Sequence, residues 1–282
     1  MSKIQEALDK IRAGQPLTAT TESAPKGTAI RQRQRGALSG GLPTGMSGTA
    51  EIARMEESAY RSDAELVELR MLNSGMSDDH ARNAIRELRT SVLQRLETDK
   101  RIIMVTSTIE GAGATFVARN LAAAIALDES KTAIIIDCNL KEPSASALAM
   151  GEGNIGLCEY LKDTRLSADE IIHRTGVARL RIIPAGTTIE EVREYFTSER
   201  LRQLLDELKR RYPERYIVVD APPIAEAADA RILADVCDYV LLVVPFGKST
   251  TGQVIQSART IGKEKFLGLV FNNKPGMPRM KW

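Results

Sequence analysis

The sequence has 282 residues, of which 43% are hydrophobic and 27% are charged, and its formal net charge is +2. The near-neutral charge and the aromatic content of 4% argue against a surface for nucleic acid, which needs basic and stacking side chains. The cysteines Cys138, Cys158 and Cys237 form no CxxC pair, which argues against zinc and disulfide frameworks and favours buried thiols in a reducing cytosol.

The first 48 residues predict a short helix followed by a linker. In residues 1–13, the side chains of Ile4, Leu8 and Ile11 fall on one face of a helical pattern. Such a helix either packs on its own domain or docks on another protein. Residues 14–48 are rich in Gly, Ser, Thr, Ala and Pro, which predicts a flexible linker. The basic run "KGTAIRQRQRG" within the linker is either solvated or in contact with anionic lipid head groups.

Residues 49–98 predict a helical region. In the stretch "SDDHARNAIRELRTSVLQRL", Ser77 is the expected N-cap, followed by Asp78 and Asp79 in the first turn. The predicted apolar stripe of this helix consists of Ala84, Ile85, Leu88, Val92 and Leu96. The predicted opposite face carries Arg82, Arg86 and Arg89.

Residues 99–282 predict a doubly wound α/β fold with a mostly parallel sheet. The runs "RIIMVTS", "TAIIIDCN", "LRIIPAG", "RYIVVDAPP", "DYVLLVVPF" and "FLGLVFNN" are apolar on both faces, and helical stretches separate most of them. Ligands of such sheets bind at the carboxyl ends of the strands. The polar residues at or next to those ends are Ser107, Asp137, Asp220 and Asn272.

None of these apolar runs approaches the ~20 residues of a membrane span, and the charged start "MSKIQEALDK" is atypical of a secretory signal. We therefore expect a cytoplasmic protein that reaches a membrane only through a partner or a surface contact.

A glycine-rich loop follows the first strand of this region and precedes a helix. Its residues are Gly111, Ala112, Gly113, Ala114, Thr115 and Phe116. Gly111 and Gly113 can adopt positive φ and turn backbone N–H groups toward a phosphate. The following helix N-terminus adds partial positive charge, and Thr115 stands where a hydroxyl ligand of Mg²⁺ belongs. The GK[ST] core of a phosphate-binding loop is absent, so the loop alone is a weak match.

Two further strand ends carry acidic residues. Asp220 ends "YIVVD" and either holds Mg²⁺ through water, as in a Walker B strand, or caps the next turn. Asp137 and Asn139 end a strand expected to lie beside the loop strand. In one subclass of P-loop proteins this second stretch is a DxD motif followed by a basic residue and Pro, and its carboxylates help hold Mg²⁺ and activate a hydroxyl.

The order and spacing of these elements resemble the bacterial tyrosine kinases of polysaccharide synthesis (the CpsD/CapB type), which are relatives of the MinD/ParA ATPases. The stretches "GLCEYLKD", "LRIIPAG", "DAPPIAEAADARILADVCDYVLLVV" and "GLVFNN" match the family, and the N-terminal stretches resemble the subgroup linked to exosortase and exopolysaccharide loci. The resemblance implies ATP and Mg²⁺ as cofactors, with Asn272 or Asn273 contacting adenine. It also implies a membrane polysaccharide co-polymerase (chain-length determinant) as partner at the inner membrane, and self-association.

Four departures from the family pattern concern its chemistry. The phosphate-loop lysine is replaced by Ala114, and the second Asp of the DxD motif by Asn139, although Lys141 keeps the basic position. The tail "KPGMPRMKW" contains no tyrosine to accept a phosphate. The oligomerisation motif ExxRxxR has lost its Glu and keeps only Arg86 and Arg89. Together these losses predict a degenerate member, a pseudokinase with weakened or lost nucleotide binding.

Two other functions stay open at this point. The protein could be an active tyrosine kinase or ATPase that uses a substituted lysine, for which Lys141 is the basic candidate by sequence. It could also be a ParA-like positioning ATPase, although the missing lysine weakens that reading equally.

Overall fold

The computed structural model describes residues 57, 59–71, 79–140, 143–151, 155–187 and 196–273. Within them, seven strands form one sheet in the order β3-β4-β2-β5-β1-β6-β7. The strands are β1 (Ile102–Ser107), β2 (Thr132–Asp137), β3 (His173–Arg174), β4 (Leu180–Ile183), β5 (Arg215–Asp220), β6 (Tyr239–Pro245) and β7 (Phe266–Asn272). All neighbouring pairs are parallel except β3 and β4, which confirms the predicted mostly parallel sheet.

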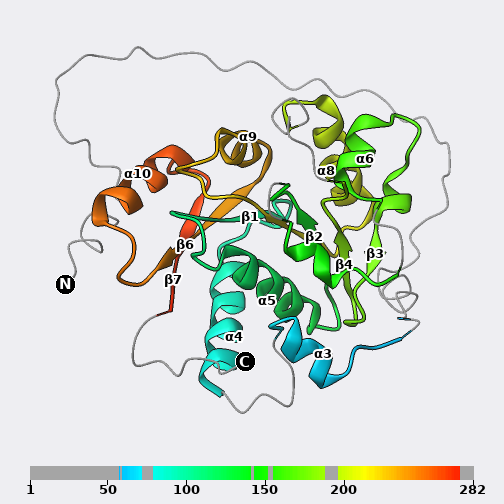
Figure 1. Ribbon diagram of the computed structural model, residues 1–282, viewed down its shortest axis with the longest axis horizontal. Coiled ribbons are helices and arrows are strands. Elements are labelled where there is room, and N and C mark those ends of the chain that lie inside the picture. The colour runs from blue at the N-terminus through cyan, green and yellow to red at the C-terminus, as the bar shows by residue number, and fades with distance from the viewer. Residues whose placement is uncertain are drawn as a thin grey trace, which may run out of the picture.

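Helices cover both faces of this sheet (Figure 1). The α-helices are α3 (Asp63–Glu68), α4 (Asp79–Leu93), α5 (Ala114–Ala126), α6 (Leu157–Lys162), α8 (Glu199–Arg211), α9 (Ala228–Val236) and α10 (Thr251–Ile261), and the 3₁₀ helices are η1 (Ala145–Leu148) and η2 (Ala168–Ile171). Helices α4 and α5 cover one face, and α6, α8, α9 and α10 cover the other. This arrangement is the doubly wound fold that the sequence predicts.

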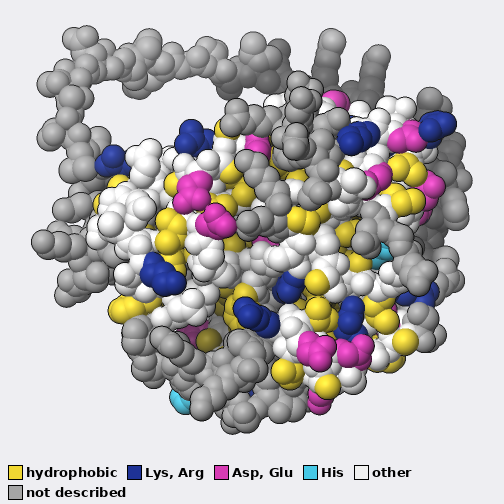
Figure 2. Space-filling model, in the orientation of Figure 1, with side chains coloured by type: hydrophobic (Ala, Val, Ile, Leu, Met, Phe, Trp, Pro, Cys, Tyr) yellow, Lys and Arg dark blue, Asp and Glu magenta, His cyan; other side chains and the backbone are white. Residues whose placement is uncertain are grey.

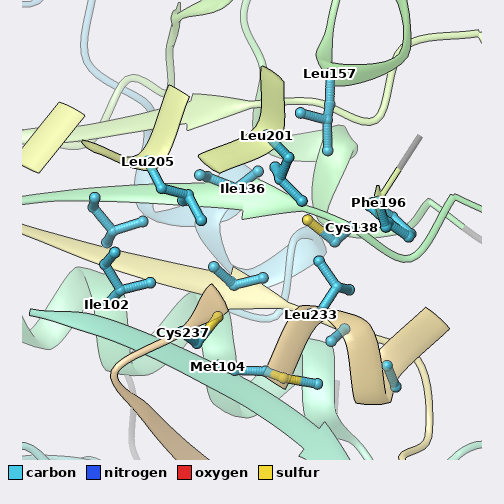
Figure 3. Packing of buried hydrophobic residues seen from close by; sticks show 14 of the residues in the cluster. Ile102, Met104, Ile136, Cys138, Leu157, Phe196, Leu201, Leu205, Leu233 and Cys237 are labelled. Atoms are coloured by element: carbon cyan, nitrogen blue, oxygen red, sulfur yellow. The ribbon is translucent and has the colours of Figure 1, made fainter. Parts of the chain in front are cut away.

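The core has two layers, one on each side of the sheet. On the face of α8 and α9, Ile136 of β2 packs with Leu201 and Leu205 of α8 and Leu233 of α9 (Figure 3). On the other face, α5 lies against the sheet with Leu121 fully buried. The strands are buried on both faces because helices cover both, as their continuous apolar runs predict. All three cysteines are free and buried, as predicted.

The apolar stripe of the helix before the sheet is shorter than predicted. Ile85 and Val92 of α4 are buried, but Ala84 is exposed, and Leu96 lies beyond the end of α4 at Leu93. The expected N-cap Ser77 and the predicted elements 1–13 and 14–48 lie outside the described residues. The apolar stripe is shorter because the helix ends three residues before the pattern does.

No helix among the described residues combines the length and the apolar character needed to cross a membrane. On the face of the molecule drawn in Figure 2, Lys and Arg side chains are interspersed with Asp and Glu. The described basic side chains on that face therefore form no single patch.

The carboxyl ends of β1, β5 and β2 lie at one edge of the sheet. Parallel pairing places Asp137 opposite Asp220 on adjacent strands, and β1 ends at Ser107 next to β5. The predicted position of the Asp137 strand directly beside the loop strand is wrong. β5 lies between β2 and β1, so Asp220 is the carboxylate nearer the glycine-rich loop along the sheet.

Candidate nucleotide site

The glycine-rich loop has the backbone conformation of an anion-binding loop. Gly111 and Gly113 have φ values of 67° and 91°, in the left-handed region that other residues rarely adopt. Gly113 is the N-cap of α5, and no side chain caps this helix end. The first backbone N–H groups of α5 are therefore available to an anion, where the helix dipole also favours negative charge.

Ala114 is the first residue of α5 and contributes no charge to this site. The first turn of α5 contains no acidic residue, so its partial positive charge is not cancelled locally. A phosphate bound here would meet backbone dipoles, but no ammonium group from the position that normally provides it. The loop thus keeps the backbone N–H groups of a phosphate site and lacks the lysine side chain.

Asn272, at the end of β7, reaches the loop from the neighbouring side of the sheet. Its Nδ2 donates a hydrogen bond to the carbonyl oxygen of Ala112 at 2.8 Å. A Cβ atom added to Gly113 would lie 2.2 Å from this nitrogen. Asn272 therefore holds the loop in place, a role that the sequence pattern did not predict.

Alanine substitutions at Gly111 and Gly113 should distinguish the cost of a positive φ from the cost of losing the contact with Asn272. Gly111→Ala is expected to cost about 1 kcal/mol of unfolding free energy from its positive φ alone, because an added Cβ meets nothing within 4 Å. Gly113→Ala should cost about 1 kcal/mol more, since Asn272 must turn away and lose its hydrogen bond. Urea unfolding measures both, and equal costs would contradict the bracing role of Asn272.

Asp220 is fully buried, and apart from the Thr115 hydroxyl, which lowers its pKa through a hydrogen bond, its carboxylate oxygens have no hydrogen-bond partner among the described residues. The alternative that Asp220 caps the next turn is therefore wrong. Burial raises the pKa of this carboxyl, and the charge of Asp137 raises it further, whereas the nearby Thr115 hydroxyl and Arg119 lower it. A buried carboxylate with a single hydroxyl partner is the arrangement that a bound cation would satisfy.

Asp137 differs from Asp220 because its oxygens are occupied. One oxygen accepts hydrogen bonds from the backbone and the hydroxyl of Ser146, both at 2.8 Å, and the other accepts one from the backbone of Asn139. The Ser146 hydroxyl in turn accepts a hydrogen bond from the backbone of Ala185. Burial raises the pKa of the Asp137 carboxyl, although the hydrogen bonds oppose the shift. Asp137 thus ties the end of β2 to η1 and to the segment after β4.

Two residues near this site carry positive charge that the sequence analysis missed. Arg119 lies one helical turn after Thr115 on α5, and its charge lowers the pKa of both the Asp137 and the Asp220 carboxyl. Lys248 lies in the loop after β6, and its neighbour Ser249 shares a hydrogen bond of 2.6 Å with Thr108 at the start of the glycine-rich loop. The sequence signal that could have indicated Arg119 is its i, i+4 spacing from Thr115. No local sequence signal indicates Lys248, because its position near the loop depends on the order of strands in the sheet. Lys141, the basic candidate from the sequence, lies outside the described residues.

The two arginines predicted for oligomerisation differ in their surroundings. Arg86 is exposed, whereas Arg89 is half-buried and donates a hydrogen bond from Nη1 to the carbonyl of Ala124 on α5 at 3.2 Å. The predicted placement of Arg89 opposite the apolar stripe is wrong, because it follows Ile85 by four residues and so shares its face. Self-association through Arg86 stays a prediction.

The residues present fit a magnesium-bound nucleotide in part. The Thr115 hydroxyl and the buried Asp220 carboxylate beside it are oxygen ligands of the kind that Mg²⁺ takes together with nucleotide phosphates. The loop backbone suits the phosphates, and Asn272 lies beside the loop. The loop provides no positive side chain to balance the phosphate charge, because Ala114 replaces the lysine.

Comparison with known proteins agrees with this geometry. A family model described as "AAA domain" matches residues 100–266, which is more than half of the chain and includes β1, the glycine-rich loop and both carboxylates. The chain belongs to the AAA-domain family.

Relatives of this AAA-domain protein are bacterial tyrosine-protein kinases. Etk of Escherichia coli K12 is 32% identical over 186 residues, covering 65% of this chain. YwqD of Bacillus subtilis 168 is 27% identical, covering 67% of this chain and 79% of YwqD. CpsD of Streptococcus agalactiae serotype III is 28% identical, covering 74% of this chain and 87% of CpsD. The aligned region spans only 25% of Etk. These relatives confirm the predicted resemblance.

Solved structures with the same fold include kinase domains. The kinase domain of Escherichia coli tyrosine kinase ETK aligns with a TM-score of 0.63 at 25% identity, covering 78% of this chain and 91% of that one. The BceF tyrosine kinase domain aligns with a TM-score of 0.62 at 27% identity, covering 79% and 88%. Apo McdA from Cyanothece, at 16% identity and a TM-score of 0.51, shares the fold alone.

Proposed function

We propose that this AAA-domain protein is a pseudokinase that regulates a membrane polysaccharide co-polymerase in exopolysaccharide synthesis. The observation that carries the proposal is Ala114 at the first position of α5, inside a loop whose glycines keep their phosphate-binding conformation. Loss of one preorganised electrostatic donor typically costs about 10²–10³ in rate. The fold is retained while the group that stabilises transferred charge is absent.

Two further changes support a loss of phosphoryl-transfer activity. Asn139 replaces the second carboxylate of the DxD motif, and an amide is a poor base. The single remaining carboxylate of that motif, Asp137, already accepts hydrogen bonds from Ser146 and Asn139. The last nine residues, which lie outside the described residues, include no tyrosine that could accept a phosphate.

ATP would bind weakly in this proposal. The backbone of Gly111 to Thr115 would surround the phosphates, Thr115 and Asp220 would hold Mg²⁺, and Asn272 would lie near the base. When bound, Mg²⁺–ATP supplies the phosphoryl group and the metal charge. The chain's own contribution is binding and orientation, because the loop offers dipoles without a lysine.

The proposed partner and location rest on the family resemblance of the sequence. We propose that the N-terminal segment docks on the cytoplasmic end of a polysaccharide co-polymerase and brings the protein to the inner membrane. Binding of the full chain to that cytoplasmic end, measured by calorimetry, tests this part. An absence of binding would refute the co-polymerase as partner but would leave the proposed lack of kinase activity untouched.

The pseudokinase proposal is tested by incubating the full chain with Mg²⁺–ATP and measuring phosphotyrosine by mass spectrometry. The ETK kinase domain serves as the active control. We expect incorporation at least about 10²-fold below that of the control. Phosphotyrosine formation on this chain at a comparable rate would refute the proposal.

A second candidate is an active enzyme whose lysine comes from another loop. The hydrogen bond between Thr108 and Ser249 supports it, because it holds the loop that carries Lys248 against the start of the glycine-rich loop. If phosphotyrosine is found, Lys248→Ala should abolish it under this alternative. Lys141→Ala is the matched comparison for the lysine proposed from the sequence.

A further inference from the structure

The described residues that precede α4, which are 57 and 59–71, lie on the side of the sheet that α5 covers (Figure 1). We call this segment the strap. It contains α3, and its apolar residues Leu66, Leu69 and Met71 pack in the same core layer as α5. Met71 is fully buried. The strap is therefore packed into the folded unit that carries the candidate site, although it precedes the sheet in the sequence.

Arg61 joins the strap to η1. Its Nε donates a hydrogen bond to the carbonyl of Thr175 at 2.8 Å, and its Nη2 donates one to the carbonyl of Leu148 at 3.2 Å. Leu148 is the last residue of η1. In the same 3₁₀ helix, the backbone and the hydroxyl of Ser146 donate to the Asp137 carboxylate, both at 2.8 Å. One guanidinium thus fixes the short helix that orients this carboxylate.

The strap fits closely against the sheet at Gly176. The backbone N–H of Arg61 donates to the carbonyl of Gly176 at 3.0 Å. Gly176 has a φ of 74°, and a Cβ atom added to it would lie 2.7 Å from Cγ of Arg61 and 2.7 Å from Sδ of Met150. A side chain at this position would push Arg61 away, so a glycine here permits the close approach of the two backbones.

The other end of the strap is attached to α5. Asn120 is fully buried, and its Nδ2 donates to the carbonyl of Arg70 at 3.0 Å. The preceding residue of α5, Arg119, donates from Nη1 to the carbonyl of Leu69 at 3.3 Å. Helix α5 begins at Ala114, inside the glycine-rich loop. The strap therefore contacts both the helix that carries the loop and, through Arg61, the helix that orients Asp137.

We propose that Arg61 is a positioning residue of the candidate nucleotide site and that the strap couples the two sides of this site, η1 with Asp137 and α5 with the loop. Attachment of the strap and binding of Mg²⁺–ATP then favour each other, because coupling between two binding events is reciprocal. Tyr60 is 65% exposed on the strap, so a protein partner can reach this segment, and a partner that detached it would lower nucleotide affinity. The inference rests on the proposed function only in taking the loop and Asp137 as the nucleotide site.

The backbone amide resonance of Ser146, observed by NMR in the absence of nucleotide, tests the first link. This N–H donates to Asp137, so its chemical shift reports the position of η1 relative to the carboxylate. We expect Arg61→Ala to move this resonance and to weaken Mg²⁺–ATP binding about fivefold, at the lower end of the usual range for coupled sites. A loss of global stability alone would lower the melting temperature without moving the resonance of the folded protein.

Arg179→Ala is the matched control. Arg179 also donates from Nε and Nη2 to two backbone carbonyls, those of Ala126 and Leu127, but at the end of α5 away from the loop. It should lower the melting temperature and leave the Ser146 resonance and the ATP affinity unchanged. If Arg61→Ala does not fold, Arg61→Lys replaces it with an expected effect of about twofold, because an ammonium group keeps the charge but lacks the fork that reaches both carbonyls.

An unchanged Ser146 resonance in the Arg61 variant overturns the proposal. An ATP affinity that the Arg61 variant lowers no more than Arg179→Ala does overturns it as well. Both readouts compare a variant with the wild-type chain, and the resonance is recorded without ATP. Phosphotyrosine formation by the wild-type chain would therefore refute the pseudokinase without changing these outcomes.

Discussion

Ala114→Lys is expected to tighten binding of Mg²⁺–ATP by about 10- to 100-fold. The new ammonium group would stand at the first position of α5, beside a loop whose backbone already adopts the phosphate-binding conformation. A charge-assisted hydrogen bond to a phosphate contributes about 1.5–3 kcal/mol, which corresponds to that range. The backbone needs no rearrangement, so the full effect of the added charge should be observed.

Isothermal titration of wild type and Ala114→Lys measures this change. Leu127→Lys is the matched control, because it adds the same charge at the exposed C-terminal end of the same helix. We expect no more than a twofold effect from it, since salt screens a charge that far from the loop. Ala114→Lys should still form no phosphotyrosine, because Asn139 remains in place of the second carboxylate. An unchanged ATP affinity would show that the missing lysine is not what limits binding.

Asp220→Asn is expected to stabilise the protein by about 2–4 kcal/mol near pH 8, because it removes a fully buried charge beside which the Thr115 hydroxyl offers only partial compensation. The pKa of Asp220 is raised in the folded state, so the folded protein binds this proton more tightly than the unfolded chain does. The stability that depends on this proton is therefore present below the unfolded pKa and is lost as pH rises through the folded pKa. The advantage of Asp220→Asn should be small near pH 4 and grow toward pH 8.

Thermal unfolding in EDTA between pH 4 and pH 8 measures whether the stability advantage of Asp220→Asn grows with pH. Asp128→Asn is the control with the opposite expectation. Hydrogen bonds from Lys131 and Ser130 hold the pKa of Asp128 below its usual value, so its contribution is present at neutral pH and is lost as pH falls. Asp128→Asn should therefore not stabilise the protein at pH 8. A melting temperature of Asp220→Asn at or below that of wild type at pH 8 would contradict the account of Asp220.

The sheet could be predicted because its strands are buried on both faces. Runs such as "AIIID" and "YIVVD" leave no alternation that would suggest a solvated face, and each ends in a polar residue at the edge where ligands bind. Strand order could not be predicted in the same way. β5 inserts between β1 and β2, and this depends on crossover connections, which periodicity does not encode.

The site could be predicted only where local sequence dictates geometry. Gly111 and Gly113 adopt positive φ as their residue type suggests. The hydrogen bond between Asn272 and Ala112 joins residues 160 positions apart, and that between Ser146 and Asp137 depends on the path of a connecting loop. Arg119 was not predicted because an arginine on a helix is ordinarily solvated, whereas here the packing of Leu69 and Arg70 against α5 leaves it half-buried.

A titration of the wild-type chain with Mg²⁺–ATP tests the central claim most directly. The claim is that the fold is retained while the charge needed to bind phosphates is lost at Ala114. We predict a dissociation constant of about 0.1 mM or weaker, which corresponds to no more than about 5.5 kcal/mol of binding free energy. A dissociation constant of about 1–10 µM would contradict the claim, because the loop would then bind ATP well without its lysine.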